Sequence, residues 1–264
     1  MHTRGVYIAV LHEGTIRTEL ATTLMRWQRE SAFPILVDFA GEKPIEANRN
    51  SIVKKFLAQD MEWLLQIDDD IIPPPNYLDL MIHNKDIITG VCFAMRQNAI
   101  VPLLLENETE HMVFKDDEVK EDKDKLFNVA KINRLEGLVE VDSIGTGAIL
   151  IHRRVFDNPE MKKHPFRTIW NEDGTRKIGQ DLQFCRIAKE NGYKIWADTR
   201  YVCEHVVDAV GLAKFYDTMT ALAIAGGDMD DDFQLRRLDN AKSIRATNEF
   251  VLPKDKRSKL KTNK

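Results

Sequence analysis

One short segment constrains the fold more than any other. Residues 62–67 form the apolar run Glu-Trp-Leu-Leu-Gln-Ile, which passes directly into three aspartates at 68–70, and three prolines follow at 73–75. Such a run is typical of a strand buried on both faces of a parallel sheet. Proline cannot donate to a strand ladder, so the strand must end beside the aspartates. The sequence therefore predicts a buried strand whose carboxyl end carries a cluster of carboxylates.

The segments around this strand alternate between two patterns. Runs of β-forming apolar residues lie at 6–11, 34–39 and 86–93, and apolar residues recur at helical spacing within 17–30 and 45–58. Strands that alternate with helices indicate a doubly wound α/β domain. Because such domains bind ligands at the carboxyl ends of their strands, the three aspartates lie where a ligand site is expected.

The second half of the chain is less regular. Residues 106–125 carry many charges without a period, which predicts a solvated insert or loop. Strand-like runs return at 138–142 and 148–151, and a helix is expected over 181–191. A long helical segment over 206–225 is expected to close the ordered part.

Composition and charge exclude several classes of protein. The chain has 264 residues, of which 43% are hydrophobic and 30% charged, as in a globular protein with a sizeable core. Its 38 Lys and Arg against 42 Asp and Glu give a net charge of −4, which argues against a nucleic-acid partner. No apolar stretch reaches the ~20 residues of a transmembrane helix, and no signal-peptide pattern opens the chain. We expect a cytoplasmic protein without a transmembrane segment.

The cysteines argue against two kinds of structural cross-link. Cys92, Cys185 and Cys203 have no CxxC spacing, which speaks against both a disulfide framework and a zinc knuckle. We therefore expect three reduced, buried thiols.

The adjacent carboxylates of Asp68, Asp69 and Asp70 repel one another unless a cation or hydrogen-bond donors compensate their charge. The end of a buried strand favours a divalent metal, because hard cations bind carboxylates together with substrate phosphate oxygens. Alternation along the strand puts Asp68 and Asp70 on one side and Asp69 on the other, so the first two can serve one ligand. An acidic turn that caps the next segment is the alternative interpretation.

Two further residues have both a structural and a catalytic interpretation. Asp181 lies in the first turn of an expected helix, where it is either a favourable helix-terminal charge or a general base on a rigid backbone. His205 ends the β-rich run 201–205, and a lone histidine is more often structural or solvated than a ligand.

Taken together, these segments resemble the GT-A glycosyltransferases that use nucleotide sugars, in particular short members similar to family 2. The resemblance spans residues 5–206 and rests on the order and spacing of Ala47-Asn48-Arg49-Asn50, Asp68-Asp69-Asp70-Ile71, the segment 141–147, the segment 179–185 and His205. It implies a Rossmann-like α/β fold with a mixed, mainly parallel sheet flanked by helices, and a C-terminal helical extension.

We expect a matching division of the chain. Residues 1–206 form the glycosyltransferase domain, with a nucleotide-binding half at 1–95 and an acceptor and catalytic half at 96–206. Residues 207–252 form the helical extension, and 253–264 form a basic, flexible tail. The tail is either a frayed end or a peripheral contact with anionic lipid or polymer.

The resemblance also implies roles for individual residues. In such enzymes the DXD carboxylates bind a Mn2+ or Mg2+ ion that bridges the donor diphosphate. Asp70 is then the direct metal ligand, with Asp68 nearer the ribose, and His205 completes the coordination. Asp181 matches the general base of inverting members, and Gln180 departs from the Glu that usually precedes it, so hydroxyl contacts are expected to differ.

The remaining matched positions concern the donor and the acceptor. The residues expected to bind the nucleotide sugar are Asp38, Arg49, Asp68, Asp69, Gly145 and Gly147. A surface helix charge is the alternative for Arg49, and a plain tight turn is the alternative for the two glycines. Trp170 is expected either to stack on an acceptor sugar or to be partly buried.

These residues predict a metal-dependent, inverting, hexosyltransferase-like enzyme. Its donor is a nucleoside-diphosphate sugar, with UDP expected before GDP, and its acceptor is a hydroxyl of a carbohydrate, lipid-linked or protein molecule. A nucleotidyltransferase or phosphoryl-transfer enzyme is an alternative, although no GxxxxGK phosphate loop is present. A non-catalytic nucleotide-sugar-binding protein is another, but it would not need Asp70, Asp181 and His205 together.

Overall fold

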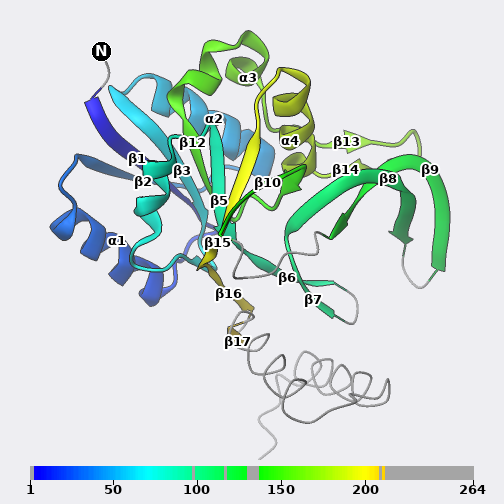
Figure 1. Ribbon diagram of the computed structural model, residues 1–264, viewed down its shortest axis with the longest axis horizontal. Coiled ribbons are helices and arrows are strands. Elements are labelled where there is room, and N and C mark those ends of the chain that lie inside the picture. Colours follow the sequence, from blue (N-terminus) through cyan, green and yellow to red (C-terminus); the bar gives the residue numbers. More distant parts are fainter. Residues whose placement is uncertain (1–2, 97–98, 116–117, 130–136, 208–209, 212–264) are drawn as a thin grey trace, which may run out of the picture. The chain divides into compact units, whose positions relative to one another are not determined.

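The computed structural model describes residues 3–96, 99–115, 118–129, 137–207 and 210–211. The chain divides into two compact units, Met1–Met95 with Ile100–Tyr216, and Arg96–Ala99 with Asp217–Lys264. Almost all described residues belong to the first unit, which contains the seven-stranded sheet of Figure 1. The strands of this sheet are β1 (Thr3–Leu11), β2 (Ile35–Ala40), β3 (Met61–Asp68), β5 (Ile87–Val91), β10 (Leu138–Val141), β12 (Ala148–His152) and β15 (Ile195–Val202).

The large sheet is mixed, with most strands in one direction. Its order is β10-β15-β5-β12-β3-β1-β2. Strand β1 is parallel to both β2 and β3, and β15 is parallel to β5, whereas β12 is antiparallel to its two neighbours and β10 is antiparallel to β15. The mixed, mainly parallel α/β sheet expected from the sequence is therefore confirmed.

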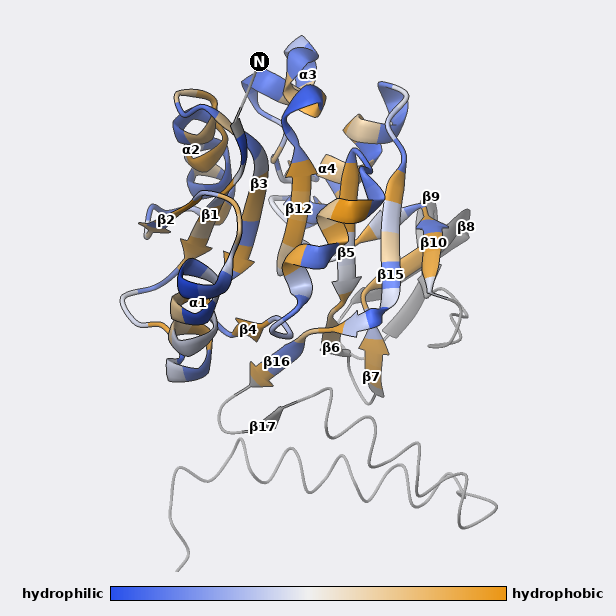
Figure 2. Cartoon of the chain, turned by 60° about the vertical axis from the view of Figure 1, so that its left-hand side comes forward, coloured by the Kyte–Doolittle hydropathy of each residue, from blue (hydrophilic) through white to orange (hydrophobic). Residues whose placement is uncertain are grey.

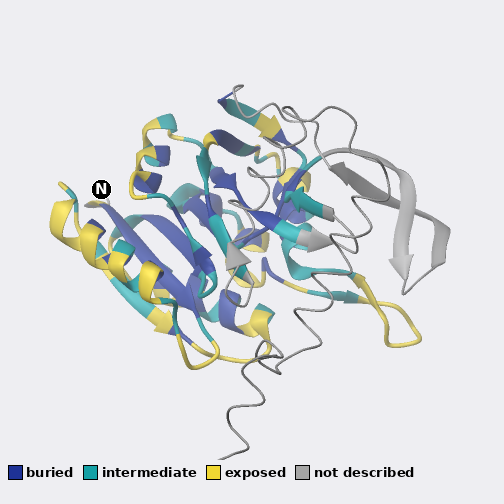
Figure 3. Cartoon of the chain, turned by 90° about the horizontal axis from the view of Figure 1, so that it is seen from below, coloured by how far each residue is buried: buried dark blue, intermediate teal, exposed yellow. Residues whose placement is uncertain are grey.

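Helices cover both faces of the sheet. The helices are α1 (Thr18–Glu30), α2 (Ile45–Leu57), α3 (Pro159–Lys163) and α4 (Gln180–Glu190), with 3-10 turns η1 (Tyr77–His83) and η2 (Arg153–Asp157). Alternate residues of β1 enter two separate cores: Ile8 packs in the cluster that contains Leu24 of α1, and Tyr7 packs in the cluster that contains Phe56 of α2 and Phe184 of α4. Both faces of the central strands are therefore buried, which explains their continuous apolar runs (Figures 2 and 3).

Further strands lie outside the large sheet. They are β4 (Ile71–Ile72), β6 (Phe93–Arg96), β7 (Ala99–Pro102), β8 (Leu104–Lys115), β9 (Glu118–Val129), β11 (Ser143–Ile144), β13 (Ile169–Trp170), β14 (Arg176–Ile178), β16 (Glu204–Val207) and β17 (Val210–Gly211). Two of them, β8 and β9, correct the expectation of a loop over 106–125. Residues 106–115 and 118–125 belong to these strands, which pair as an antiparallel ribbon.

The start of the expected C-terminal helix is also different. Residues 206–207 and 210–211 belong to β16 and β17, which pair with each other, so no helix begins at Val206. The remainder of the expected extension and the basic tail lie outside the described residues.

Two other expectations concern the described part of the chain. Cys92, Cys185 and Cys203 are buried and free, as the sequence predicts. Across the described ranges, no helix is both long enough and apolar enough to cross a membrane.

The buried carboxylate of Asp198 links β15 to the 3-10 turn η1. Asp198 is fully buried and accepts hydrogen bonds from the Arg200 side chain at 2.6 and 2.9 Å, and His83 Nε2 lies 2.9 Å from its Oδ2 atom. Burial alone would raise the pKa of Asp198, but the hydrogen bonds from Arg200 and His83 hold it below its ordinary value. The charged form of Asp198 is therefore the form that stabilises the fold.

We expect Asp198→Asn to lower the free energy of unfolding at pH 7 by about 1–3 kcal/mol, because Arg200 and His83 lose the charged acceptor of their hydrogen bonds. A carboxylate with a lowered pKa stabilises the fold above its unfolded pKa of about 4, and this stabilisation is lost as the pH falls through the folded value. The difference between wild type and Asp198→Asn in urea unfolding should therefore shrink below about pH 4. Asp79→Asn, at an exposed aspartate, is the control, and a difference that is constant with pH would contradict the assignment.

Candidate functional site

The sheet topology brings three strands together at the acidic turn (residues 68–70). The carboxyl ends of β1 and β3 meet at one edge of the sheet, and the antiparallel β12 begins at the same edge. The Asp68 N–H donates to the Gly147 carbonyl at 2.8 Å, and the Asp69 N–H donates to the Leu11 carbonyl at 2.9 Å. The turn is thus held in place by backbone bonds to its two neighbours in the sheet.

A cavity of about 820 Å³ opens beside this turn. It is lined by Glu13 and residues 15–17 of the β1–α1 loop, by Thr18 and Glu19 at the start of α1, and by Asp69, Asp70 and Val206. Its volume is that of a small-molecule site. Arg17 faces the same space as the two aspartates and makes no ion pair with any described residue.

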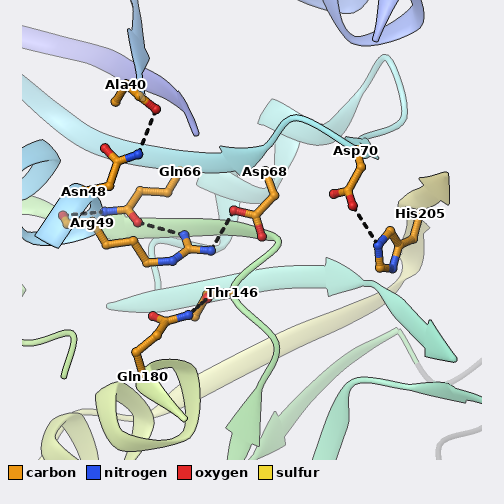
Figure 4. Close-up of polar contacts among 9 residues, drawn as sticks. All are labelled: Ala40, Asn48, Arg49, Gln66, Asp68, Asp70, Thr146, Gln180 and His205. Atoms are coloured by element: carbon orange, nitrogen blue, oxygen red, sulfur yellow. Dashed lines mark hydrogen bonds and ion pairs between the residues drawn. The ribbon is translucent and has the colours of Figure 1, made fainter. Parts of the chain in front are cut away.

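Asp68 points away from Asp70 and is held by a buried arginine (Figure 4). Arg49 Nη2 donates to Asp68 Oδ1 at 2.7 Å, and Arg49 Nη1 donates to Gln66 Oε1 at 3.0 Å. The Arg49 side chain is 1% exposed, so it acts on the site through Asp68. This placement corrects the idea of a surface helix charge: Asn48 and Arg49 are both buried, although they lie off the apolar face of α2.

The carboxyl group of Asp68 is poorly solvated, although 28% of its side-chain area remains exposed. Burial raises the pKa of Asp68 to about 6; Arg49 opposes this shift, and the charges of Asp70 and Asp69 add to it. A nearby cation would favour the charged form of this group.

Asp70 is paired with His205, which β16 brings to the site through its antiparallel pairing with β4. His205 Nε2 lies 3.1 Å from Asp70 Oδ2, and Nδ1 donates to the Phe93 carbonyl at 2.6 Å. Burial lowers the pKa of His205, but the hydrogen bonds to Asp70 and Phe93 raise it to about 9. Because the carbonyl holds Nδ1–H, Nε2 is the atom left to face a ligand beside Asp70.

These atoms fit two of the positions that a divalent cation needs. A carboxylate and an imidazole with its second nitrogen held by a carbonyl form an ordinary metal-binding pair. Mg2+ is usually held by one or two carboxylates, with substrate phosphates and waters in the other positions. Among the described residues, no group of three or more His, Cys, Asp or Glu side chains is placed to hold a metal, and a role of Asp68 as a third ligand stays a prediction.

The start of α4 lies against the same edge of the sheet. Gln180 Nε2 is 3.5 Å from the hydroxyl of Thr146, which precedes β12. The Gln180 Oε1 atom is buried and has no hydrogen-bond partner among the described residues. Asp181 follows in the first turn of α4, where its Oδ1 accepts from the Leu182 N–H at 3.0 Å. An unpaired buried acceptor next to a carboxylate is suited to a hydroxyl ligand.

Asp38 and Asp69 are held by neighbouring groups. Asp38 Oδ2 accepts from the Tyr7 hydroxyl at 2.6 Å and from the Lys55 ammonium at 3.1 Å. Burial would raise the pKa of Asp38, but these two bonds keep it below its ordinary value. Asp69 Oδ2 lies 3.3 Å from the Glu13 N–H. Contacts of Asp38 and Asp69 with the nucleotide sugar stay predictions.

The glycines and the tryptophan have plain structural surroundings. A Cβ atom on Gly145 would lie 2.5 Å from the Leu103 side chain, and one on Gly147 would lie 2.9 Å from the Ile71 side chain. Close packing therefore requires glycine at both positions, and an approach to a sugar stays a prediction. Trp170 is 58% exposed in the β13–β14 hairpin, so it is free to stack on a ligand, and this role also stays a prediction.

Sequence reasoning missed three residues of the site. Gln66 could have been found, because a polar side chain inside a buried strand needs a partner, which here is Arg49. Thr146 and Arg17 gave no comparable signal, since both lie in loops whose geometry depends on the rest of the fold.

Comparison with known proteins gives distant similarities. No protein-family model matches the chain. In sequence, it is similar to the mannan polymerase complex subunit mnn9 of Schizosaccharomyces pombe, with 22% identity over 180 residues, 61% of this chain and 51% of that protein. The chain thus spans about half the length of this relative.

Two solved structures match part of the chain. A197 from STIV has a TM-score of 0.51 and 16% identity, with 78% of this chain and 87% of that chain covered. GalNAc-T7, solved with UDP, GalNAc and Mn2+, has a TM-score of 0.41 and 10% identity, with 79% and 45% covered. At these identities a structural likeness concerns the fold alone. The mixed α/β, GT-A-like architecture expected from the sequence is confirmed.

We expect Arg49→Met to lower the free energy of unfolding by about 3 kcal/mol, because it leaves the partly buried Asp68 without its cation. Urea unfolding at pH 7.5 measures the effect. Arg29→Met is the matched control: its side chain is 75% exposed and pairs with the neighbouring Glu30, so a change within about 0.5 kcal/mol is expected. Equal effects of the two substitutions would show that the Arg49 bonds do not support the site.

Proposed function

We propose that the protein is a metal-dependent, inverting glycosyltransferase that moves a sugar from a nucleoside-diphosphate sugar to a hydroxyl acceptor. The observation that carries this proposal is the pairing of Asp70 with His205 beside a cavity at the carboxyl edge of the sheet. That edge is where α/β sheets bind nucleotides. The similarity to a subunit of a mannan polymerase complex supports a sugar as the transferred group.

The donor is proposed to lie in the cavity between the β1–α1 loop and the acidic turn. Arg49 binds one carboxylate oxygen of Asp68, Oδ1. The other oxygen would accept a hydrogen bond from a hydroxyl of the ribose. Arg17 would face the negative charge of the diphosphate, because it lines the cavity and makes no ion pair with any described residue. UDP is the donor nucleotide that we would test first.

Asp70 and His205 would hold Mn2+ or Mg2+, which neutralises the charge that grows on the diphosphate as the sugar leaves. Asp181 would take the proton of the acceptor hydroxyl as that oxygen attacks the anomeric carbon. The free Gln180 Oε1 would accept a hydrogen bond from a sugar hydroxyl and so orient it. Attack from the face opposite the leaving group inverts the anomeric centre.

We expect Asp70→Asn and His205→Gln each to weaken UDP binding in the presence of Mn2+ by about tenfold or more, because each removes a proposed metal ligand. Calorimetric titration of UDP, GDP, CDP and dTDP, with Mn2+ or with EDTA, measures this. His164→Gln, at an exposed histidine distant from these ligands in the sequence, should bind as wild type does. Absence of nucleotide binding by the folded wild-type protein with Mn2+ would refute the proposed donor site.

We expect Asp181→Asn to bind the nucleotide within about twofold of wild type and to lose about 10²-fold or more in sugar transfer, because it removes only the base. Release of nucleoside diphosphate from the sugar conjugate, with and without added sugar acceptors, is the readout. The anomeric configuration of the product, read by NMR, tests inversion. Turnover of Asp181→Asn equal to wild type would exclude Asp181 as the base.

A further inference from the structure

A second concave surface lies on the outer side of α2. This groove has a volume of about 880 Å³ and runs between α2 and the segment 162–167, which contains the end of α3. Both walls belong to the same compact unit, and α2 and α3 are in contact. None of the proposed catalytic or donor-binding residues lines it, so it is separate from the cavity at the acidic turn.

The groove is held in shape by bonds between its two walls. Asn50 Nδ2 donates to the Phe166 carbonyl at 2.6 Å, and the Phe166 N–H donates to Asn50 Oδ1 at 3.1 Å. Below the surface, the fully buried Phe166 ring stacks on Phe184 of α4, with 4.5 Å between the ring centroids. A ligand therefore meets a groove that is formed before it binds.

The charged residues that line the groove are mainly cationic: Glu46 is a carboxylate among Lys54, Lys162, Lys163 and Arg167. Lys54, Lys162 and Lys163 are exposed and form no ion pair with any residue that the structure describes. Arg167 lies 3.7 Å from Glu160, but both side chains are about half exposed, and such a pair neutralises little. Lysines are electrostatically favourable in the last turns of α2 and α3, because the carboxyl end of a helix is partially negative. This does not explain why the lysines of both helices line the same groove.

The shape of the groove limits what can occupy it. The lining of α2 extends from Glu46 to Leu57, a distance of ~16 Å along the helix axis, which an extended polypeptide covers with about five residues. A flat bilayer cannot reach the floor of a groove. Nucleic acid would use an aromatic stacking surface, whereas the aromatic ring of this lining, Phe166, is fully buried. Ala47 and Leu57 offer apolar contacts between the cations instead.

We propose that this groove binds an extended, acidic segment of a partner protein, with carboxylates on the lysine rim and an apolar side chain at Leu57. Charge complementarity and the length of the groove carry the inference. It does not depend on the proposed glycosyl transfer.

The test uses a fluorescein-labelled peptide of alternating Glu and Leu as the probe, with fluorescence anisotropy as the readout. The double variant Lys54→Glu, Lys163→Glu should bind the peptide at least about tenfold more weakly than the wild type. The control double variant Arg26→Glu, Arg29→Glu makes the same charge change on exposed positions of α1 and should bind as wild type does. Equal weakening of peptide binding in both double variants would show that the effect depends on net charge alone, and would overturn the proposal.

A second variant tests the groove without changing its charge. Ala47 is exposed and lines the groove, so Ala47→Trp should obstruct it and weaken peptide binding, whereas Thr22→Trp on α1 should not. Phosphatidylserine vesicles and an oligo-dT strand are tested in parallel. If the vesicles or the oligo-dT strand bind the wild type but not the groove variants, and the peptide does not bind, the groove is a lipid or nucleic-acid site. That result would overturn the proposal. No binding of the peptide to folded wild type at low salt would also overturn it.

Discussion

The guanidinium of Arg49 is the charge around which the site is organised. It lies almost fully buried between Gln66, Asp68 and the ring of Phe166, whose centroid is 5.8 Å from the guanidinium carbon. A charge in such surroundings is tolerable only when it is paired and hydrogen-bonded. The ion pair therefore fixes the end of β3 to α2, and with it the direction in which the acidic turn leaves the sheet.

The three adjacent aspartates avoid mutual repulsion by turning to three different partners. Asp68 faces Arg49, Asp69 faces a backbone N–H, and Asp70 faces His205. The alternation expected from a continuing strand would have directed Asp68 and Asp70 to one ligand. It fails because β3 ends at Asp68 and the chain turns immediately afterwards. A donor that spans the ribose and the diphosphate would contact the separated carboxylates at different points.

The sequence predicts the framework of this molecule well and its polar interior less well. Apolar periodicity locates α1, α2 and the central strands, because burial on one or two faces leaves a direct pattern in the chain. The same reasoning misses that Asn48 and Arg49 are buried, because a count of apolar residues does not register a polar side chain that finds buried partners. The ribbon of β8 and β9 is missed because the charged sequence of this segment has no regular alternation of apolar and polar residues. His205 comes to Asp70 through the pairing of β16 with β4, which no local pattern encodes.

The position of β12 in the sheet has a consequence for how the chain can fold. This strand is inserted between β3 and β5, which precede it by more than fifty residues, and β5 has β12 and β15 as its partners in the sheet. Until residue 148 has been synthesised, one edge of β3 and both edges of β5 lack their partners, and such edges promote aggregation. Residues 1–95 are therefore not an independent folding unit: long-range pairing must close the sheet before the acidic turn acquires its neighbours, and folding through such contacts is slow.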